Sequence, residues 1–277
     1  MSELKDYNLT ILGCGVMGTA VLSAILSTSF DPYPKEIVCC TSSEKSALKL
    51  KSTYGDKIQT SYGAESNKEA VKKANVLILG CKPFLFKQIM DEVDIKEGPP
   101  TLIISLMAGW TIQQIKETTG CSEIARVMTN TPAKYACGTA AISFSESAAI
   151  YEDLVMKLIG NIGLAVQLPE KNMDAATALV GSGPAFCLLM LEALTDGGVK
   201  MGIPYAVAKQ CAAKVMEGTA KMVLETGDHP AVLKSAVCTP GGTTIAGLMV
   251  MEDKGVRSGI ARAVEEAANV ATSLGKK

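Results

Sequence analysis

The feature that most constrains this chain is a short apolar run that breaks directly into three closely spaced glycines. Residues 9–12 are long enough for one buried strand, and Gly13-Cys14-Gly15-Val16-Met17-Gly18 then leads into the helical Ala/Val/Leu-rich segment 19–26. In such a turn Gly13 permits the bend, Gly15 lets a pyrophosphate approach the backbone and Gly18 lets the helix pack on the strand. This context favours a dinucleotide-binding turn, with Val16 and Met17 part of it, over an ordinary glycine-rich turn.

Length and composition limit the class of protein. A chain of 277 residues exceeds the usual size of one domain, so we expect two, and 48% hydrophobic residues supply a large core. The net charge of −1 argues against nucleic-acid or anionic-membrane partners. The N-terminus shows no secretory signal, and the apolar stretches 101–110 and 184–191 are too short to span a bilayer. We therefore expect a cytoplasmic protein with neither a membrane nor a nucleic-acid partner.

The cysteines and the single histidine exclude several kinds of site. Nine cysteines without regular spacing do not form a disulfide framework, and the adjacent Cys39 and Cys40 suit reduced core thiols. With no C-x-x-C pair and one histidine, the chain lacks most zinc-site patterns, and we expect no metal. A Ser-His-Asp hydrolase or a histidine-acid dehydrogenase would have to use His229. That residue precedes Pro230 in a sequence typical of a helix entry, so we do not expect it to be catalytic.

Short apolar strands alternate with helical segments in the first part of the chain. This alternation predicts an α/β domain built on a doubly wound parallel sheet of the Rossmann type. We predict strands at residues 9–12, 37–41, 76–79, 102–106 and 123–128, with helices at 19–26, 43–54, 84–93 and 112–118 and a short charged helix that ends with residues 69–73.

The pattern changes after Pro169, where long Ala/Met/Leu-rich helical stretches replace the alternation. We therefore predict two domains, a dinucleotide-binding domain at 1–168 and an all-α domain at 169–277. Many of its helices are apolar on more than one face, which indicates either deep burial or packing against another copy of the protein. Because about 105 residues enclose little interior of their own, we favour packing against a second copy.

The end of the second strand bears on the choice of cofactor. NAD-preferring sites place an acidic side chain there to bind the ribose 2′-hydroxyl. Here the strand ends in Thr41-Ser42-Ser43, and no acid occurs before Glu44. These hydroxyls and the nearby Lys45 could hold a 2′-phosphate, or they could supply a serine-rich helix cap, and both can be true. We favour NADP(H), with NAD(H) as a possible second cofactor.

Two later strands end in segments that should line the same groove, because ligands of open α/β sheets lie at the carboxyl ends of strands. They are Cys81-Lys82-Pro83 and Met107-Ala108-Gly109. Lys82 could contact ribose or phosphate, or it could face solvent.

The segment Thr239-Pro240-Gly241-Gly242-Thr243-Thr244 resembles an anion-binding turn. Successive backbone amides without bulky side chains can surround a carboxylate, and the two final threonines add hydroxyl donors. The alternative is a helix-start turn in which these threonines cap the residues that follow. Two glycines beside two threonines exceed what a cap needs, so we favour the binding site.

Six motifs are spread over essentially the whole chain. They are Gly13–Gly18, Cys81-Lys82-Pro83, Arg126-Val127-Met128-Thr129-Asn130-Thr131-Pro132, Gly181-Ser182-Gly183-Pro184-Ala185, Asp196-Gly197-Gly198-Val199-Lys200-Met201-Gly202 and Pro240-Gly241-Gly242-Thr243-Thr244-Ile245. Together they resemble the pyrroline-5-carboxylate reductases, and the motifs at 196–202 and 240–245 are specific to that family among NADP-dependent enzymes.

The resemblance implies reduction of 1-pyrroline-5-carboxylate to L-proline with NAD(P)H, and a homodimer formed by the helical domain and often assembled into a ring of dimers. It implies that Thr244 hydrogen-bonds the nitrogen of the cyclic imine. The turn around Thr244 would hold the carboxylate, through Thr239, Gly241, Gly242 and Thr243. Asn67 would contact the adenosine side of the cofactor. Gly227 departs from the glutamate that some members carry near the substrate.

Two rival functions have discriminating features. A β-hydroxyacid reductase or an imine reductase has a similar two-domain build, but enzymes that oxidise alcohols need a lysine base early in the second domain, and residues 172–191 contain no lysine. A non-catalytic NADPH-binding scaffold would keep the glycine turn without a reason to keep a carboxylate turn at 239–244.

Overall fold

The computed structural model describes residues 4–98 and 100–274, which form two compact units. One unit combines residues up to Ser182 with those from Glu266 onward, and the other comprises Gly183–Glu265. Because their mutual placement is not determined, each is described by itself. The domain boundary that we expect between residues 168 and 169 stays a prediction.

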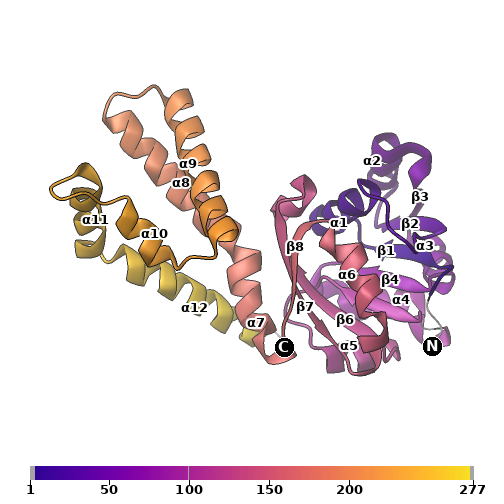
Figure 1. The fold of residues 1–277 in the computed structure, drawn as a ribbon. Helices are drawn as coiled ribbons and strands as arrows, with labels where there is room; N and C mark the ends of the chain where they lie inside the picture. Colours follow the sequence, from indigo (N-terminus) through magenta and orange to yellow (C-terminus); the bar gives the residue numbers. More distant parts are fainter. Residues whose placement is uncertain (1–3, 99, 275–277) are drawn as a thin grey trace. The chain divides into compact units, whose positions relative to one another are not determined.

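The first unit is built on one eight-stranded sheet, with the strand order β3-β2-β1-β4-β5-β6-β7-β8 (Figure 1). Every neighbouring pair is parallel except β6 and β7, which run antiparallel. The order reverses direction between β1 and β4, which is the usual place for a ligand crevice. The strands are β1 (Asn8–Leu12), β2 (Glu36–Thr41), β3 (Gln59–Tyr62), β4 (Val76–Leu79), β5 (Leu102–Ser105), β6 (Ile124–Thr129), β7 (Gly138–Phe144) and β8 (Gly163–Gln167).

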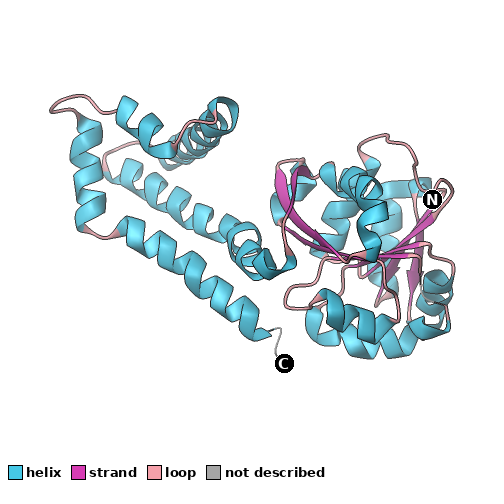
Figure 2. Ribbon diagram, turned by 60° about the horizontal axis from the view of Figure 1, so that its bottom comes forward, coloured by secondary structure: helices cyan, strands magenta, loops and turns pink. Residues whose placement is uncertain are grey.

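Helices cover both faces of this sheet, as Figure 2 shows. On one face the core includes side chains of α1 and α6, and on the other it includes those of α3, α4 and α5. The alternation of β1 explains both layers, since Leu9 and Ile11 face the first core and Leu12 faces the second. The helices of this unit include α1 (Val16–Leu26), α2 (Glu44–Tyr54), α3 (Ala64–Lys72), α4 (Phe86–Val93), α5 (Ile112–Thr119), α6 (Glu152–Gly160) and α7 (Met173–Ala176).

The structure confirms the doubly wound sheet and adds elements that the sequence pattern did not predict. The strand predicted at 76–79 is the fourth, because the polar segment before Gly63 forms β3. The region between β6 and residue 168 contains β7, α6 and β8. Since β7 is antiparallel to β6, the sheet is mostly rather than wholly parallel.

The second unit consists of helices with little buried surface. Its members are α8 (Gly183–Lys200), α9 (Tyr205–Thr226), α10 (Pro230–Ala236), α11 (Thr243–Asp253) and the first part of α12 (Val256–Leu274). Within residues 183–265, all of which the structure describes, only Thr195, Ala208 and Ala212 are buried. Large apolar side chains such as Leu188 and Leu189 are 64% and 66% exposed. A unit of this composition needs a covering partner to bury its apolar faces.

The helical run Glu170–Lys200 is long and apolar enough to cross a membrane by length and composition. It has 31 residues, and only 11% of its most apolar window is buried. The sequence expectation that no apolar stretch could span a bilayer therefore does not hold for this helix, because α7, a π-helical segment at Thr177–Ser182 and α8 follow one another without a break.

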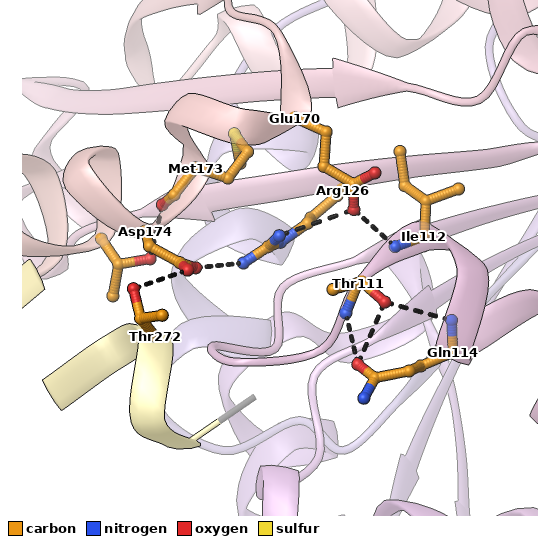
Figure 3. A network of polar contacts seen from close by, with 9 residues as sticks. Thr111, Ile112, Gln114, Arg126, Glu170, Met173, Asp174 and Thr272 are labelled. Carbon is orange, nitrogen blue, oxygen red and sulfur yellow. Dashed lines mark hydrogen bonds and ion pairs between the residues drawn. The ribbon is translucent and has the colours of Figure 1, made fainter. Parts of the chain in front are cut away.

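Arg126 of β6 holds together four segments of the first unit (Figure 3). Its guanidinium is 3% exposed and lies 3.0 Å from Oδ1 of Asp174 in α7 and 3.6 Å from Oε1 of Glu170. The Glu170 carboxylate accepts a hydrogen bond from the Ile112 backbone N–H at the start of α5, at 2.7 Å. Asp174 also accepts one from the Thr272 hydroxyl of α12, at 3.0 Å. One buried cation thus ties the C-terminal helix to the sheet.

We predict that Arg126→Met lowers the free energy of unfolding by about 2 kcal/mol. The substitution leaves two carboxylates without their cation, and their exposure of 34% and 36% keeps the cost below that of a fully buried pair. Thermal unfolding followed by circular dichroism measures this. The matched control is Arg257→Met, which removes an exposed pair with Glu252 and should leave the melting temperature nearly unchanged. Equal melting temperatures for all three proteins would contradict the prediction.

Candidate dinucleotide cleft and anion-binding turn

The glycine turn between β1 and α1 has the geometry that a bound pyrophosphate needs. Gly13 has a φ of +99°, and a Cβ there would lie 2.6 Å from the backbone N of Cys81. A Cβ on Gly18 would lie 2.5 Å from the carbonyl oxygen of Gly13, so these two glycines are required by packing. At Gly15, the N-cap of α1, a Cβ would meet nothing within 4 Å. The open space there leaves the helix N-terminus accessible to an anion.

A cleft of about 330 Å³ lies at this turn. It is lined from the carboxyl ends of β1, β2 and β4 and by the beginning of α3, which matches the switch point of the sheet. One wall comes from Leu85, Ile89 and Val93, which recur every four residues from the end of the 3-10 turn at Pro83–Leu85 through α4. No sequence motif specifies these residues, although their helical spacing is the signal from which this wall could be predicted.

The cleft brings together seven of the predicted cofactor residues: Gly13, Gly15, Thr41, Ser42, Asn67, Cys81 and Lys82. The other eight lie outside its lining: Val16, Met17, Gly18, Ser43, Pro83, Met107, Ala108 and Gly109. Val16 is nevertheless 75% exposed in the first turn of α1, whereas Met107 is 1% exposed. Lys82 is exposed at the cleft, which fits either of its two predicted roles.

The hydroxyls at the end of β2 have different tasks. Ser43 is the N-cap of α2, and its Oγ accepts a hydrogen bond from the Ser46 backbone N–H at 3.4 Å. Thr41 donates its hydroxyl to the carbonyl oxygen of Ser43 at 3.0 Å. Asn67 donates from Nδ2 to the carbonyl oxygen of Thr41 at 3.0 Å, so its side chain fixes the strand end. The cap interpretation is thus confirmed for Ser43, while Ser42 remains exposed at the cleft.

The thiols beside the cleft are protonated at neutral pH. Burial raises the pKa of Cys40 to about 12 and that of Cys81 to about 11. A side-chain hydrogen bond with Cys39, together with burial, raises the pKa of Cys14 well above its usual value. Cys81 donates its thiol to Sδ of Met107 at 3.6 Å. Neutral thiols do not repel phosphate, and they are poor nucleophiles.

Trp110 links the two segments that follow β4 and β5. Its indole N–H donates to the carbonyl oxygen of Pro83 at 3.0 Å, and its ring packs edge-on against Phe86 with 4.6 Å between centroids. This contact holds the ends of both strands in a fixed arrangement. Trp110 could not be predicted as a site residue, because no motif of the dinucleotide-binding turn specifies it.

The segment 239–244 forms a tight turn before α11 in the helical unit. The backbone N–H of Gly242 donates to the carbonyl oxygen of Thr239 at 3.0 Å, and Gly241 has a φ of +66°. Gly242 is the N-cap, and no side chain caps this helix. Thr243 and Thr244 are therefore the first two helical residues, exposed, with amides that have no acceptor inside the helix. This arrangement can bind a carboxylate, and it rules out threonine capping.

His229 has the structural role that the sequence suggested. It is the N-cap of α10, and its Nδ1 accepts a hydrogen bond from the Ala231 backbone N–H at 3.1 Å. Among the described residues, no group of three or more His, Cys, Asp or Glu side chains is arranged to hold a metal ion.

Two family models match the chain, one in each part. The family described as pyrroline-5-carboxylate reductase dimerisation matches residues 170–274, and the one described as NADP oxidoreductase, coenzyme F420-dependent, matches residues 8–109. The pyrroline-5-carboxylate reductase of Kluyveromyces lactis is 49% identical, over 99% of this chain and 100% of its own length. The enzyme of Schizosaccharomyces pombe is 38% identical, over 96% and 98%.

Solved structures show the same fold. The pyrroline-5-carboxylate reductase of Coxiella burnetii has a TM-score of 0.85 at 28% identity, over 98% of this chain and 99% of its own. The Plasmodium falciparum pyrroline carboxylate reductase, with NADP bound, has a TM-score of 0.84 at 23% identity, over 99% and 100%. Given the near-complete coverage by its relatives, this chain belongs to the pyrroline-5-carboxylate reductase family.

Proposed function

We propose that the chain reduces 1-pyrroline-5-carboxylate to L-proline with a hydride from NADPH, the last step of proline biosynthesis. The observation that carries this proposal is its 49% identity, over the full length, to a relative named for that reaction. A cleft at the glycine turn in one unit and a turn with open backbone amides in the other support it.

NADP(H) is the cofactor that the cleft fits best. The open N-terminus of α1 at Gly15 suits the pyrophosphate, and Ser42 with the exposed Lys45 suits a 2′-phosphate. No acid ends β2. The P. falciparum enzyme, with its similar fold, binds NADP.

The turn at 239–244 suits the substrate's carboxylate. Its glycines leave the amides of Thr243 and Thr244 open, and a helix N-terminus favours negative charge. The family resemblance gives Thr244 the hydrogen bond to the ring nitrogen. A threonine hydroxyl in that position orients the imine carbon for attack.

The reaction does not require a strong acid from the protein. When bound, the reduced nicotinamide supplies the hydride. The protonated cyclic imine is already an electrophile, so close and aligned donor and acceptor atoms matter most. The Nδ1 lone pair of His229 accepts the hydrogen bond that caps α10, so this nitrogen is not available to accept a proton during the reaction.

Two rival functions have less support than the reduction of 1-pyrroline-5-carboxylate. An imine reductase of Pseudomonas has a similar fold at a TM-score of 0.54 and 13% identity, and this likeness shows the fold alone. A non-catalytic NADPH-binding scaffold would account for the cleft but not for the open amides at 239–244.

The chain is further proposed to work as a cytoplasmic homodimer, assembled into a ring of dimers. The dimerisation match over 170–274 and the exposed apolar faces of α8 support the dimer. A partner copy would also bury the apolar side chains of the run Glu170–Lys200, so these residues would not need a membrane to cover them. Nine free cysteines support a reducing compartment.

We expect the purified protein to oxidise NADPH with 1-pyrroline-5-carboxylate and with few other small cyclic imines. Absorbance at the nicotinamide band measures the rate, and kcat/KM for NADPH should exceed that for NADH because no acid ends β2. Activity confined to another imine would support the first alternative, and NADPH binding without turnover would support the scaffold. A clear NADH preference would contradict the assignment of Ser42 and Lys45.

Thr244→Ala should lower kcat about a hundredfold while leaving NADPH affinity nearly unchanged, because it removes one donor that aligns the imine. His229→Gln should keep kcat within about threefold of the wild-type value. A tenfold loss would require the activation free energy to rise by about 1.4 kcal/mol. Both are measured at saturating NADPH. Wild-type turnover in Thr244→Ala would remove this residue from the mechanism, and inactive but folded His229→Gln would restore a histidine acid.

Light scattering of the full chain should give at least a dimer at micromolar concentration. The double variant Leu188→Glu/Leu189→Glu should dissociate it and lose activity, because two charges would replace exposed apolar side chains of α8. Leu48→Glu, on a 62% exposed position of α2, is the control and should change neither property. A monomeric wild type would refute the proposed assembly.

A further inference from the structure

The corner where β2 and β3 end contains the carboxylate of Glu44, whose position bears on the choice between NADPH and NADH. Thr41 and Tyr62, the last residues of the two strands, are partners in the parallel register. Glu44 is the first residue of α2, two positions after Ser42, and Gly63 follows Tyr62. Ser42 and Gly63 both line the cleft, so Glu44 and Tyr62 lie within two residues of its lining, on two different elements.

Most polar groups of this corner are already engaged within the protein. The Thr41 hydroxyl and the Ser43 hydroxyl bond to their own segment, as described above. Asn67 is engaged at both ends, since its Oδ1 also accepts a hydrogen bond from the Ser61 hydroxyl at 2.9 Å. Of the residues assigned to the 2′-phosphate, the exposed Ser42 and Lys45 remain to contact a ligand.

Glu44 and Lys45 are the charged residues that directly follow Ser42 and Ser43, at the start of α2. A 2′-phosphate carries up to about two negative charges at neutral pH. A carboxylate free to turn toward Ser42 would repel that phosphate, and it would accept a hydrogen bond from the 2′-hydroxyl of NADH. The direction in which Glu44 is held thus bears on which cofactor the corner favours.

In the structure, Tyr62 holds that carboxylate. Its hydroxyl donates to Oε1 of Glu44 at 3.2 Å, across from the end of the edge strand. The same hydrogen bond is the main reason why the pKa of Tyr62 is raised, so the hydroxyl stays protonated as a donor. Tyr62 is 46% exposed and does not belong to the packed core.

We propose that Tyr62 is a specificity-determining residue, which favours NADPH by holding the Glu44 carboxylate away from the 2′-phosphate position. This inference rests on the proposed use of NADPH. It assigns the cofactor preference to a pair of residues from two elements, beyond the hydroxyls that follow β2.

A double-mutant cycle tests the proposal, with two probes that differ only in the 2′-phosphate, adenosine 2′,5′-bisphosphate and 5′-AMP. Titration calorimetry on the full-length protein gives their dissociation constants, and the preference is the ratio of the 5′-AMP constant to the bisphosphate constant. Tyr62→Phe should lower this preference about two- to fivefold, a range typical of exposed charges. Glu44→Gln should raise it, and Tyr62→Phe in that background should leave it unchanged within about 1.5-fold. Glu36→Gln, at the opposite end of β2, is the control for net charge and should have no effect.

An unchanged preference in Tyr62→Phe, an equal fall in both backgrounds, or a fall in Glu44→Gln would overturn the proposal. Equal binding of both probes by the wild type would overturn it as well, while leaving reduction with NADH possible. If the cycle behaves as expected but the wild type does not reduce 1-pyrroline-5-carboxylate, the specificity role stands and the proposed function fails.

Discussion

The cofactor cleft depends on the close packing of three glycines, Gly13 directly after β1, Gly18 in α1 and Gly80 directly after β4. A Cβ on Gly80 or on Gly18 would lie 2.6 or 2.5 Å from the carbonyl oxygen of Gly13. Gly13 in turn lies against the backbone of Cys81. Because no side chain separates these segments, the start of α1 lies directly over the switch point of the sheet, with its free amides at the cleft. Without this contact the strand order alone would not form an anion site.

Strands that are apolar on both faces could be predicted from the sequence, and strands that are polar, exposed or rich in small residues could not. The central strands β1, β4 and β5 are apolar on both faces, so continuous hydrophobic runs reveal them. The edge strand β3 has the polar sequence Gln-Thr-Ser-Tyr, and β8 is half exposed, so neither shows a hydrophobic run. In β7, Ala140, Ala141 and Ser143 are buried by packing between layers, although their residue types do not favour strands. Pairing with their neighbours determines these three strands.

Site residues could be predicted from the sequence where the residue type alone determines their role. They could not be predicted where contacts between distant segments determine that role. The glycines of the turn could be identified from spacing, because their packing leaves no room for another residue. The division of tasks between Ser42 and Ser43 could not, since either hydroxyl could have been the cap. Tyr62 and Glu44 are 18 residues apart and meet only through the register of β2 and β3. Trp110 likewise acts on a loop 27 residues away.

In the helical unit, the geometry of one turn is determined locally, whereas the burial of the helices depends on a partner. The turn at 239–244 is fixed by its own backbone, through the Gly242 hydrogen bond and the positive φ of Gly241, so its amides are oriented without help from a partner. The apolar faces of α8 and α9 are different, because within residues 183–265 only three side chains are buried. The geometry of this turn therefore needs no contact beyond its own segment, whereas the stability of the helices around it does. An enzyme built in this way would lose its activity on dissociation through instability of its helices, even with every group of the turn intact.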